Sequence, residues 1–158
     1  MPEILNLRDH MQMLQSASGK EITILYSRDS QVRHVYMNAD HAKNPPKTWY
    51  GESVGRFDGD TLVIDTIGLN DKTDTDRFGT PHSDQIHVVE RYRVSGDKKA
   101  LEVTFTVEDP KFFTTIWSGR ADYRRDGRPV LETICAENTS ASENGAKPEI
   151  PVALKSDF

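Results

Sequence analysis

Apolar residues recur along this chain mostly at every second position, in short runs separated by turn residues. A period of two is typical of β-strands whose two faces lie in different environments. Turn-forming stretches such as 58–60 (Asp-Gly-Asp) and 95–97 (Ser-Gly-Asp) separate the runs at fairly even intervals. The pattern predicts strands over residues 21–27, 31–38, 53–59, 61–69, 86–94, 100–109, 113–125 and 131–137.

These strands predict an all-β fold, for which we expect a single antiparallel β-barrel of about eight to nine strands, lipocalin-like or calycin-like in shape. Closure of the sheet would remove its exposed edges. Residues 1–138 would form this one domain and residues 139–158 a loose C-terminal tail, because Ser, Asn, Gly and Pro accumulate after Asn138. Two longer loops, 39–50 and 70–85, are expected to rim one mouth of the barrel.

Residues 1–20 leave two alternatives open. Their apolar residues follow the spacing of one helical face, namely Ile4, Leu7, Met11 and Leu14. The small residues at 16–19 would equally serve as the turn of a hairpin between residues 10–14 and the strand at 21–27. We favour the hairpin.

Composition and charge exclude several classes of function. There are 20 Lys and Arg residues against 25 Asp and Glu, a formal net charge of -5 and no block of basic residues, so nucleic acid is not an expected partner. No apolar run approaches the ~18 residues of a membrane span, so no membrane partner is expected. The single cysteine, Cys135, excludes an internal disulfide and is expected to be a small buried residue. Residues 1–3 do not open a signal sequence, which predicts a cytoplasmic protein as written, or a periplasmic one if the chain has been trimmed.

Glu90 departs from the hydrophobic pattern. Period two places it on the same face as Val88 and Tyr92, a face that is otherwise apolar. Because an unpaired buried carboxylate is costly, Glu90 must either pair with an inward arginine, such as Arg33 or Arg56, or be held in its neutral form. A carboxyl group of the second kind suits proton-transfer chemistry.

Asp65 is a second acidic residue in an apolar setting. Both faces of the strand at 61–69 are largely apolar, so this strand needs a cover outside the barrel as well as a core within it. Assembly into a homo-oligomer, which we expect, or a terminal segment would supply that cover. Thr61 and Thr66 are the nearest polar residues to Asp65 in this pattern.

One stretch of the sequence brings His82, His87 and Glu90 close together. His87 and Glu90 lie three apart on a strand and therefore point to opposite faces, so no metal site is expected. We favour an arrangement in which His82 hangs from its loop over the barrel opening toward Glu90 and relays a proton. In the alternative, His82 only caps Ser83 or Asp84.

Residues 51–55, Gly-Glu-Ser-Val-Gly, match the G-x-S-x-G pattern of serine hydrolases. The catalytic serine of that pattern lies on a sharp turn between a strand and a helix. Here the pattern is followed by strand, Asp-Gly turn and strand, which is a hairpin. We therefore interpret Ser53 as part of a narrow strand that bends or leaves room inside the barrel, and retain hydrolysis only as a third hypothesis.

Four strings of residues form longer motifs, namely SVGRFDGDTLVIDTIGLND, PHSDQIHVVERYRV, LEVTFTVEDP and ICAEN. They resemble strings of an uncharacterised family of small, often secreted bacterial β-rich proteins. The family patterns are close to G-x-S-x-G-x-W-x-G-D-T-L-V-V-D-T-x-G-x-N-D and P-H-S-E-x-L-H-V-x-E-R, and the resemblance covers residues 11–138. It implies little about activity, but it singles out as matching positions Ser53, Asp65, Asn70, Asp71, His82, Ser83, His87 and Glu90.

The chain departs from the family pattern around the expected cavity. Phe57 stands where relatives tend to have Trp, Asp84 stands for Glu, and residues 113–119 read FTTIWSG where a Y-T-K-P-W string is usual. These departures imply that the ligand of this protein differs from the ligands of the family. By fold analogy, such barrels resemble lipocalin-like and allene-oxide-cyclase-like folds, which bind apolar small molecules and in some cases rearrange them.

Two hypotheses of function follow. The first is a cofactor-independent acid/base enzyme, of isomerase, lyase or cyclase type, that acts on an apolar or aromatic small molecule inside the barrel. Its expected catalytic residues are Glu90, His82, His87 and Asp65. Its expected substrate-binding residues are Tyr92, Arg56, Ser53, Phe57, Trp117 and Asp71. The second hypothesis is a non-catalytic binding or carrier protein. A histidine meeting Glu90 in a reachable cavity would favour the enzyme, whereas the enzyme hypothesis would fail if Glu90 were locked to an arginine with no cavity beside it.

Overall fold

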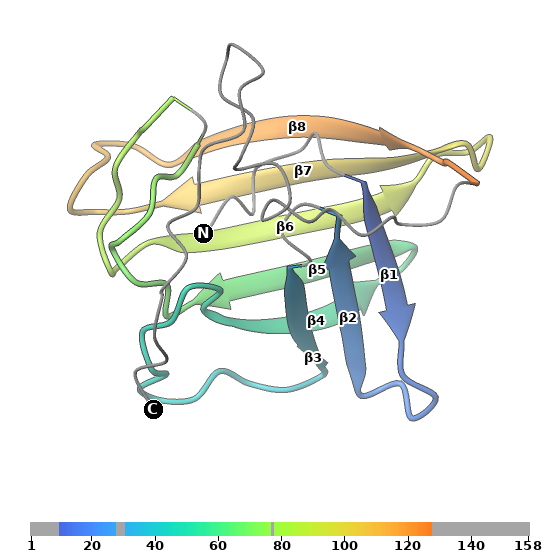
Figure 1. The fold of residues 1–158 in the computed structure, drawn as a ribbon, viewed down its shortest axis with the longest axis horizontal. Helices are drawn as coiled ribbons and strands as arrows, with labels where there is room; N and C mark the ends of the chain where they lie inside the picture. Colours follow the sequence, from blue (N-terminus) through green and yellow to red (C-terminus); the bar gives the residue numbers. More distant parts are fainter. Residues whose placement is uncertain (1–9, 28–30, 77, 128–158) are drawn as a thin grey trace, which may run out of the picture.

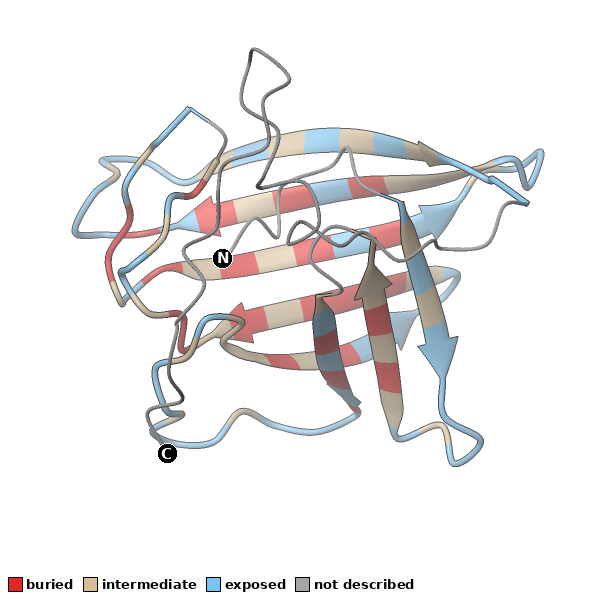
Figure 2. Ribbon diagram, in the orientation of Figure 1, coloured by how far each residue is buried: buried red, intermediate tan, exposed pale blue. Residues whose placement is uncertain are grey.

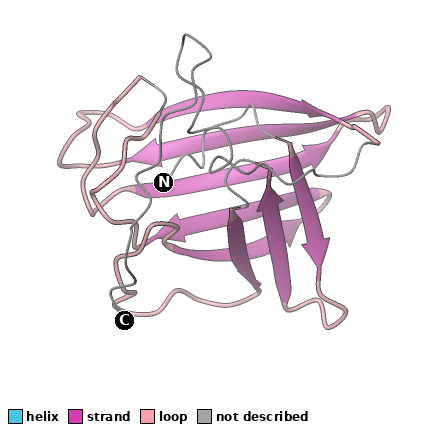
Figure 3. Cartoon of the chain, in the orientation of Figure 1, coloured by secondary structure: helices cyan, strands magenta, loops and turns pink. Residues whose placement is uncertain are grey.

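The computed structural model describes residues 10–27, 31–76 and 78–127. These residues form strands and loops, and no helix is present among them (Figure 3). The strands are β1 (Met11–Gln15), β2 (Glu21–Tyr26), β3 (Val32–Met37), β4 (Glu52–Asp58), β5 (Thr61–Ile67), β6 (His87–Val94), β7 (Ala100–Glu108) and β8 (Trp117–Arg124). The all-β prediction is confirmed. The predicted strand at 131–137, Cys135 and the predicted tail lie outside the described residues.

The eight strands form one sheet in the order of the sequence, and the sheet curls into a half-barrel (Figure 1). Neighbouring strands are antiparallel except for β3 and β4, which pair in parallel through Val35 and Ser53. Parallel neighbours need a long connection, which the loop at 39–50 supplies. Among the described residues β1 and β8 do not pair, so the expected closed antiparallel barrel is replaced by an open one.

The chain begins its sheet with the hairpin that the small residues at 16–19 predict. Leu14 pairs with Thr23 in the register of β1 with β2. Gly19 has a φ of 70°, a left-handed conformation that glycine adopts at little cost in a tight turn. Residues 11–15 are therefore a strand, and the helical alternative is wrong for this segment.

The core fills the concave face of the sheet. Inward residues alternate with outward ones along the strands, so that buried bands recur along β2 to β7 in Figure 2. One cluster of buried side chains includes Ile24, Val35 and Ile64, and a second is built around Val88 and Phe105. This alternation is the one that the period of two predicts.

The outer face of β5 is covered in part, as its sequence predicts, although Asp65 on this face stays partly exposed. Val63 points outward but is only 2% exposed. The loop at 39–50 lies against the end of this strand, because Thr48 forms a bridge with Leu69, and a Cβ added to Gly68 would contact Pro45. This loop therefore brings side chains of its own onto the outer face of the sheet.

No helix long and apolar enough to cross a membrane occurs in the described part of the chain.

Candidate functional site

The concave face holds a buried ion pair between Arg33 on β3 and Glu90 on β6. Their side chains are 2% and 1% exposed, and Arg33 Nη2 lies 2.5 Å from Glu90 Oε2. Burial opposes the charge of Arg33, but the Glu90 carboxylate outweighs it and raises the pKa of the guanidinium. Glu90 lies on the apolar face, as predicted, and of the alternatives left open the structure shows the pair with Arg33. Arg56, the other arginine considered, lies exposed on the outer face.

Three further side chains complete this network. Arg33 donates through Nε to Ser53 Oγ at 3.1 Å and through Nη2 to Thr66 Oγ1 at 2.7 Å. The hydroxyl of Tyr92 donates to Glu90 Oε1 at 2.7 Å, and burial raises the pKa of Tyr92 well above its ordinary value of 10.0. Within the network, Arg33 Nη1 is the one buried polar atom that has no hydrogen-bond partner among the described residues.

This network removes several residues from the expected catalytic site. Ser53 is 2% exposed and hydrogen-bonded to Arg33 and Thr66, so it is not placed as a nucleophile. Glu90 is not a free acid or base, because both its oxygens are engaged by Arg33 and Tyr92. The two pockets described below are lined by other residues. The enzyme hypothesis with Glu90 acting inside the barrel therefore fails by its own criterion, and Glu90, Ser53 and Tyr92 have a structural role.

His82 does not reach toward Glu90, so the favoured arrangement for this residue is wrong. It is 2% exposed, with Nδ1 2.9 Å from the Ser83 carbonyl oxygen and Nε2 3.1 Å from Thr73 Oγ1. Because a carbonyl oxygen only accepts, Nδ1 carries the proton and Nε2 is free to accept from Thr73. His82 thus fastens its own loop, close to the capping role considered as the alternative.

The outer face of the sheet brings together Asp65 and two imidazoles. Asp65 Oδ1 on β5 lies 2.8 Å from Nε2 of His87 on β6 and 3.0 Å from Nε2 of His41 in the loop at 39–50. Asp65 and His87 were both expected to be catalytic, and the register of β5 with β6 places them on one face. The expected neighbours of Asp65, Thr61 and Thr66, are replaced by these two histidines.

Two glutamates extend this cluster on either side. Glu52 Oε1 on β4 lies 3.0 Å from His41 Nδ1 and also accepts the backbone N–H of Ala42 at 2.8 Å. Glu108 Oε2 on β7 lies 3.9 Å from His87 Nδ1, within ion-pair range but beyond a hydrogen bond. Carboxylates and imidazoles therefore alternate in a row that crosses the sheet from β4 to β7. We call these five residues the outer relay: Glu52, His41, Asp65, His87 and Glu108.

The electrostatics of the outer relay follow from these contacts. The hydrogen bond with Asp65 raises the pKa of His87 above 6.5, although partial burial opposes it. The same hydrogen bond, joined by the one from His41, lowers the pKa of Asp65 below 3.8. His41 lies between two acceptor-only carboxylates, so all of its contacts are hydrogen bonds only when both ring nitrogens carry protons.

The outer relay can be reached from solvent. The side chains of Asp65 and His87 are 28% and 36% exposed, and that of His41 is 20% exposed. His87 Nδ1 makes no hydrogen bond with any described residue. A small pocket of about 290 Å³ lies close by, with Ile67, Pro45 and Lys47 in its wall.

The remaining expected site residues lie apart from the outer relay. Phe57 is 55% exposed at the end of β4, and Asp71 is exposed in the loop at 70–85. Trp117 packs edge-to-face against Phe105 and Phe113, with ring centroids 5.9 and 5.8 Å away. These contacts make Trp117 part of the core rather than a stacking wall of a cavity.

Sequence reasoning did not find His41 or Glu52. No periodicity links His41 to Asp65, because His41 belongs to an irregular loop and lies 24 positions before it. The one available signal was the length of the loop at 39–50, since long ordered loops often carry functional side chains. Glu52 occupies a variable position of the G-x-S-x-G pattern, which assigns a role only to the serine.

The cluster is arranged for hydrogen bonding. Both imidazoles direct Nε2 at the same oxygen of Asp65. Within residues 10–27, 31–76 and 78–127, no group of three or more His, Cys, Asp or Glu side chains is placed to hold a metal ion. No protein-family model, curated protein or solved structure matches this chain.

Proposed function

We propose that the protein is a cofactor-independent acid/base enzyme, of isomerase, lyase or cyclase type, and that it transfers protons at His87 on the outer face of the sheet. The observation that carries this proposal is the contact of Asp65 Oδ1 with His87 Nε2 at 2.8 Å. It fixes the orientation of the ring and leaves Nδ1 as the proton-exchanging atom. The reaction class is the one that the sequence suggests, moved from the interior to the outer face.

His87 would act in both protonation states. Its raised pKa increases the fraction of the imidazolium form near neutral pH. Neutral His87 would accept a proton from an activated C–H bond at Nδ1, and the resulting imidazolium, stabilised by ionised Asp65, would return that proton to another atom of the same substrate. The proton count balances, and no redox partner is needed.

Asp65 is itself held in position by its other neighbours. His41 contacts the same oxygen of Asp65, and Glu52 anchors His41 through its second nitrogen. Such support reduces the movement needed when His87 becomes charged. His41 and Glu52 are therefore positioning residues in this proposal.

An apolar substrate has a surface to rest on beside His87. Val54 and Val89 flank Asp65 directly in the sheet register, and both are only partly buried. Ile67 lies on the same face and forms part of the small pocket, whose volume of about 290 Å³ suits a small ring. This surface takes the place of the barrel interior, which is filled with core side chains.

A deuterium-exchange assay tests the proposal whatever the natural substrate is. A panel of small apolar and aromatic ketones is incubated with the protein in D2O, and loss of C–H signals is followed by NMR. We expect exchange of at least one compound, and a loss of about 100-fold or more in His87→Gln.

His34→Gln is the matched control, because His34 also pairs with a carboxylate, Glu21, on the outer face but is 53% exposed and outside the outer relay. It should leave exchange unchanged. Retained exchange in His87→Gln would overturn the assignment. Binding of a panel compound without exchange would instead support the carrier hypothesis.

A further inference from the structure

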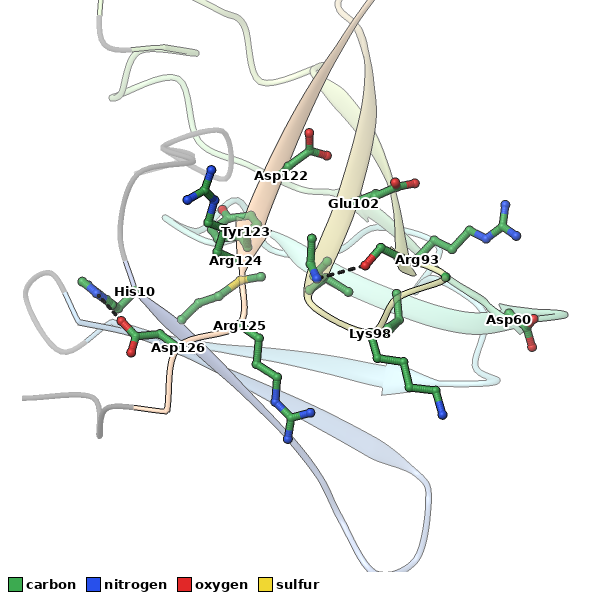
Figure 4. A pocket seen from close by; sticks show the side chains of 16 residues that line it. His10, Asp60, Arg93, Lys98, Glu102, Asp122, Tyr123, Arg124, Arg125 and Asp126 are labelled. Atoms are coloured by element: carbon green, nitrogen blue, oxygen red, sulfur yellow. Dashed lines mark hydrogen bonds and ion pairs between the residues drawn. The ribbon is translucent and has the colours of Figure 1, made fainter.

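We propose that a second site, the groove at the open edge of the half-barrel, binds an amphipathic anion, meaning a single carboxylate head on an apolar chain or ring. The groove has a volume of about 1490 Å³ and is lined by the start of β1, the turn between β6 and β7, and the end of β8 (Figure 4). It lies where β1 and β8 fail to pair, away from the outer relay.

Part of the groove is apolar. Met11, Leu101 and Tyr123 line it and pack against the core cluster on their other side. Val94 also lines it and is 55% exposed, although its strand alternation would bury it in a closed barrel. An apolar chain laid along these residues would remove them from water, which is favourable in proportion to the area covered.

Two cations stand at the rim of this apolar surface. Lys98 lies in the turn between β6 and β7, and Arg125 follows β8, with its backbone N–H donating to the Lys99 carbonyl at 2.8 Å. Figure 4 shows both side chains extending in the same direction from these two neighbouring segments, while Arg93 and Arg124 point away from each other. Neither Lys98 nor Arg125 has an ion-pair partner within the part of the chain that the structure describes.

The acidic side chains of the groove are mostly engaged. Glu102 and Asp122 share Arg120, at 3.4 and 3.1 Å, and Asp126 lies 3.5 Å from His10. Asp60 stands at the far side of the groove in Figure 4, away from Lys98 and Arg125. Lys98 and Arg125 therefore remain cations of the groove with which no described carboxylate pairs, and an anionic head would supply that partner.

The backbone of Lys98 is a second and independent observation. Its φ is 59°, a left-handed conformation that side-chain-bearing residues rarely adopt. The turn, closed by Ser95 N–H to Ala100 O at 2.9 Å and Lys98 N–H to Ser95 O at 2.9 Å, is of a kind that favours glycine at this position. A lysine held in a strained conformation points to a use for its ammonium group.

Titration calorimetry with decanoate tests the proposal, and decyltrimethylammonium serves as the probe of opposite charge. Decanoate should bind and the cation should not. Lys98→Gly keeps the turn and relieves its strain, so it should unfold at the same or a higher temperature yet bind decanoate about three- to five-fold more weakly. Arg125→Gln should weaken binding similarly, and the double variant about tenfold or more.

Asn38→Gly is the matched control. Asn38 is the other described non-glycine residue with positive φ, at 54°, and it does not line the groove. It should unfold near the wild-type temperature, because asparagine tolerates this conformation, and it should bind decanoate like the wild type. Equal binding of the two probes, absence of decanoate binding, or unchanged binding in the double variant would overturn the proposal. The outer relay can be tested separately, since the two sites share no residue.

Discussion

Arg33 and Glu90 belong to strands separated by two others in the sheet, yet their side chains meet at 2.5 Å. The curl of the sheet makes this contact, because β3 and β6 face each other across the concave side (Figure 1). The pair therefore ties the N-terminal part of the half-barrel to its centre. It does so in a region where both side chains are almost completely buried.

Glu90→Gln should destabilise the protein by about 3–5 kcal/mol, because the charge of Arg33 would remain buried without its counter-ion. Urea denaturation at pH 7 measures the change in the free energy of unfolding. Arg91→Gln is the control, since Arg91 pairs with Asp58 at 3.5 Å where the side chains are 49% and 71% exposed. That change should cost less than about 1 kcal/mol. A Glu90→Gln protein as stable as the control would contradict a structural role for the pair.

Much of this fold can be predicted from the sequence because period two is a local property. The alternation places Glu90 inside with Val88 and Tyr92, and the structure confirms this face. The two-sided burial of β5 is likewise readable, because Val63 and Ile64 are consecutive and both are apolar.

Features that depend on the path of a loop could not be predicted. The parallel pairing of β3 with β4 depends on how residues 39–50 cross the sheet, and this segment has no repeating pattern. The contact of Asp65 with His41 could not be predicted for the same reason, since His41 lies on that loop. β8 begins at Trp117 rather than at residue 113, because Phe113 N–H is taken by the Asp109 carbonyl in a turn.

Gly51→Ala should be far more costly than Gly59→Ala. Both glycines have positive φ, 67° and 59°, so either change introduces backbone strain of about 1 kcal/mol or more. A Cβ at Gly51 would also lie 2.5 Å from the carbonyl oxygen of Ile67, whereas nothing lies within 4 Å of one at Gly59. Urea midpoints of the two variants compare them directly. Equal midpoints would show that the close approach of Gly51 to the end of β5 leaves room for a side chain.

Asp109→Ala should loosen the loop that carries His82. Asp109 accepts both the backbone N–H of Ser83 at 2.6 Å and its hydroxyl at 2.7 Å, and both residues are buried. Loss of these bonds leaves two buried donors unsatisfied, which should cost about 1–3 kcal/mol for each donor. Hydrogen exchange of the backbone amides of residues 82–86 should accelerate.

Asp97→Ala is the control for this loop, because Asp97 accepts from Ser95 and Lys99 in a similar way but at exposed positions. Water can replace those contacts, so the effect on stability should be small. Unchanged exchange at residues 82–86 in Asp109→Ala would mean that other contacts hold the loop.

The coupling between Asp65 and His87 should depend on pH with a definite sign. Asp65 has a lowered pKa, so its contribution is present above 3.8 and is lost as the pH falls through the lowered value. His87 has a raised pKa, so its contribution is complete below 6.5 and is lost as the pH rises through the raised value. The stabilisation should therefore be greatest between pH 3.8 and 6.5 and weaker on both sides.

A double-mutant cycle of Asp65→Asn and His87→Gln, with unfolding followed in urea at about pH 3, 5.5 and 9, isolates this coupling. It also cancels the separate loss of the contact between Asp65 and His41. We expect at most about 1 kcal/mol at pH 5.5, because these side chains are partly exposed and solvent screens the pair. A coupling that is equal at all three pH values would show that the contact does not depend on opposite charges on the two residues. It would remove the electrostatic basis for proton transfer at His87.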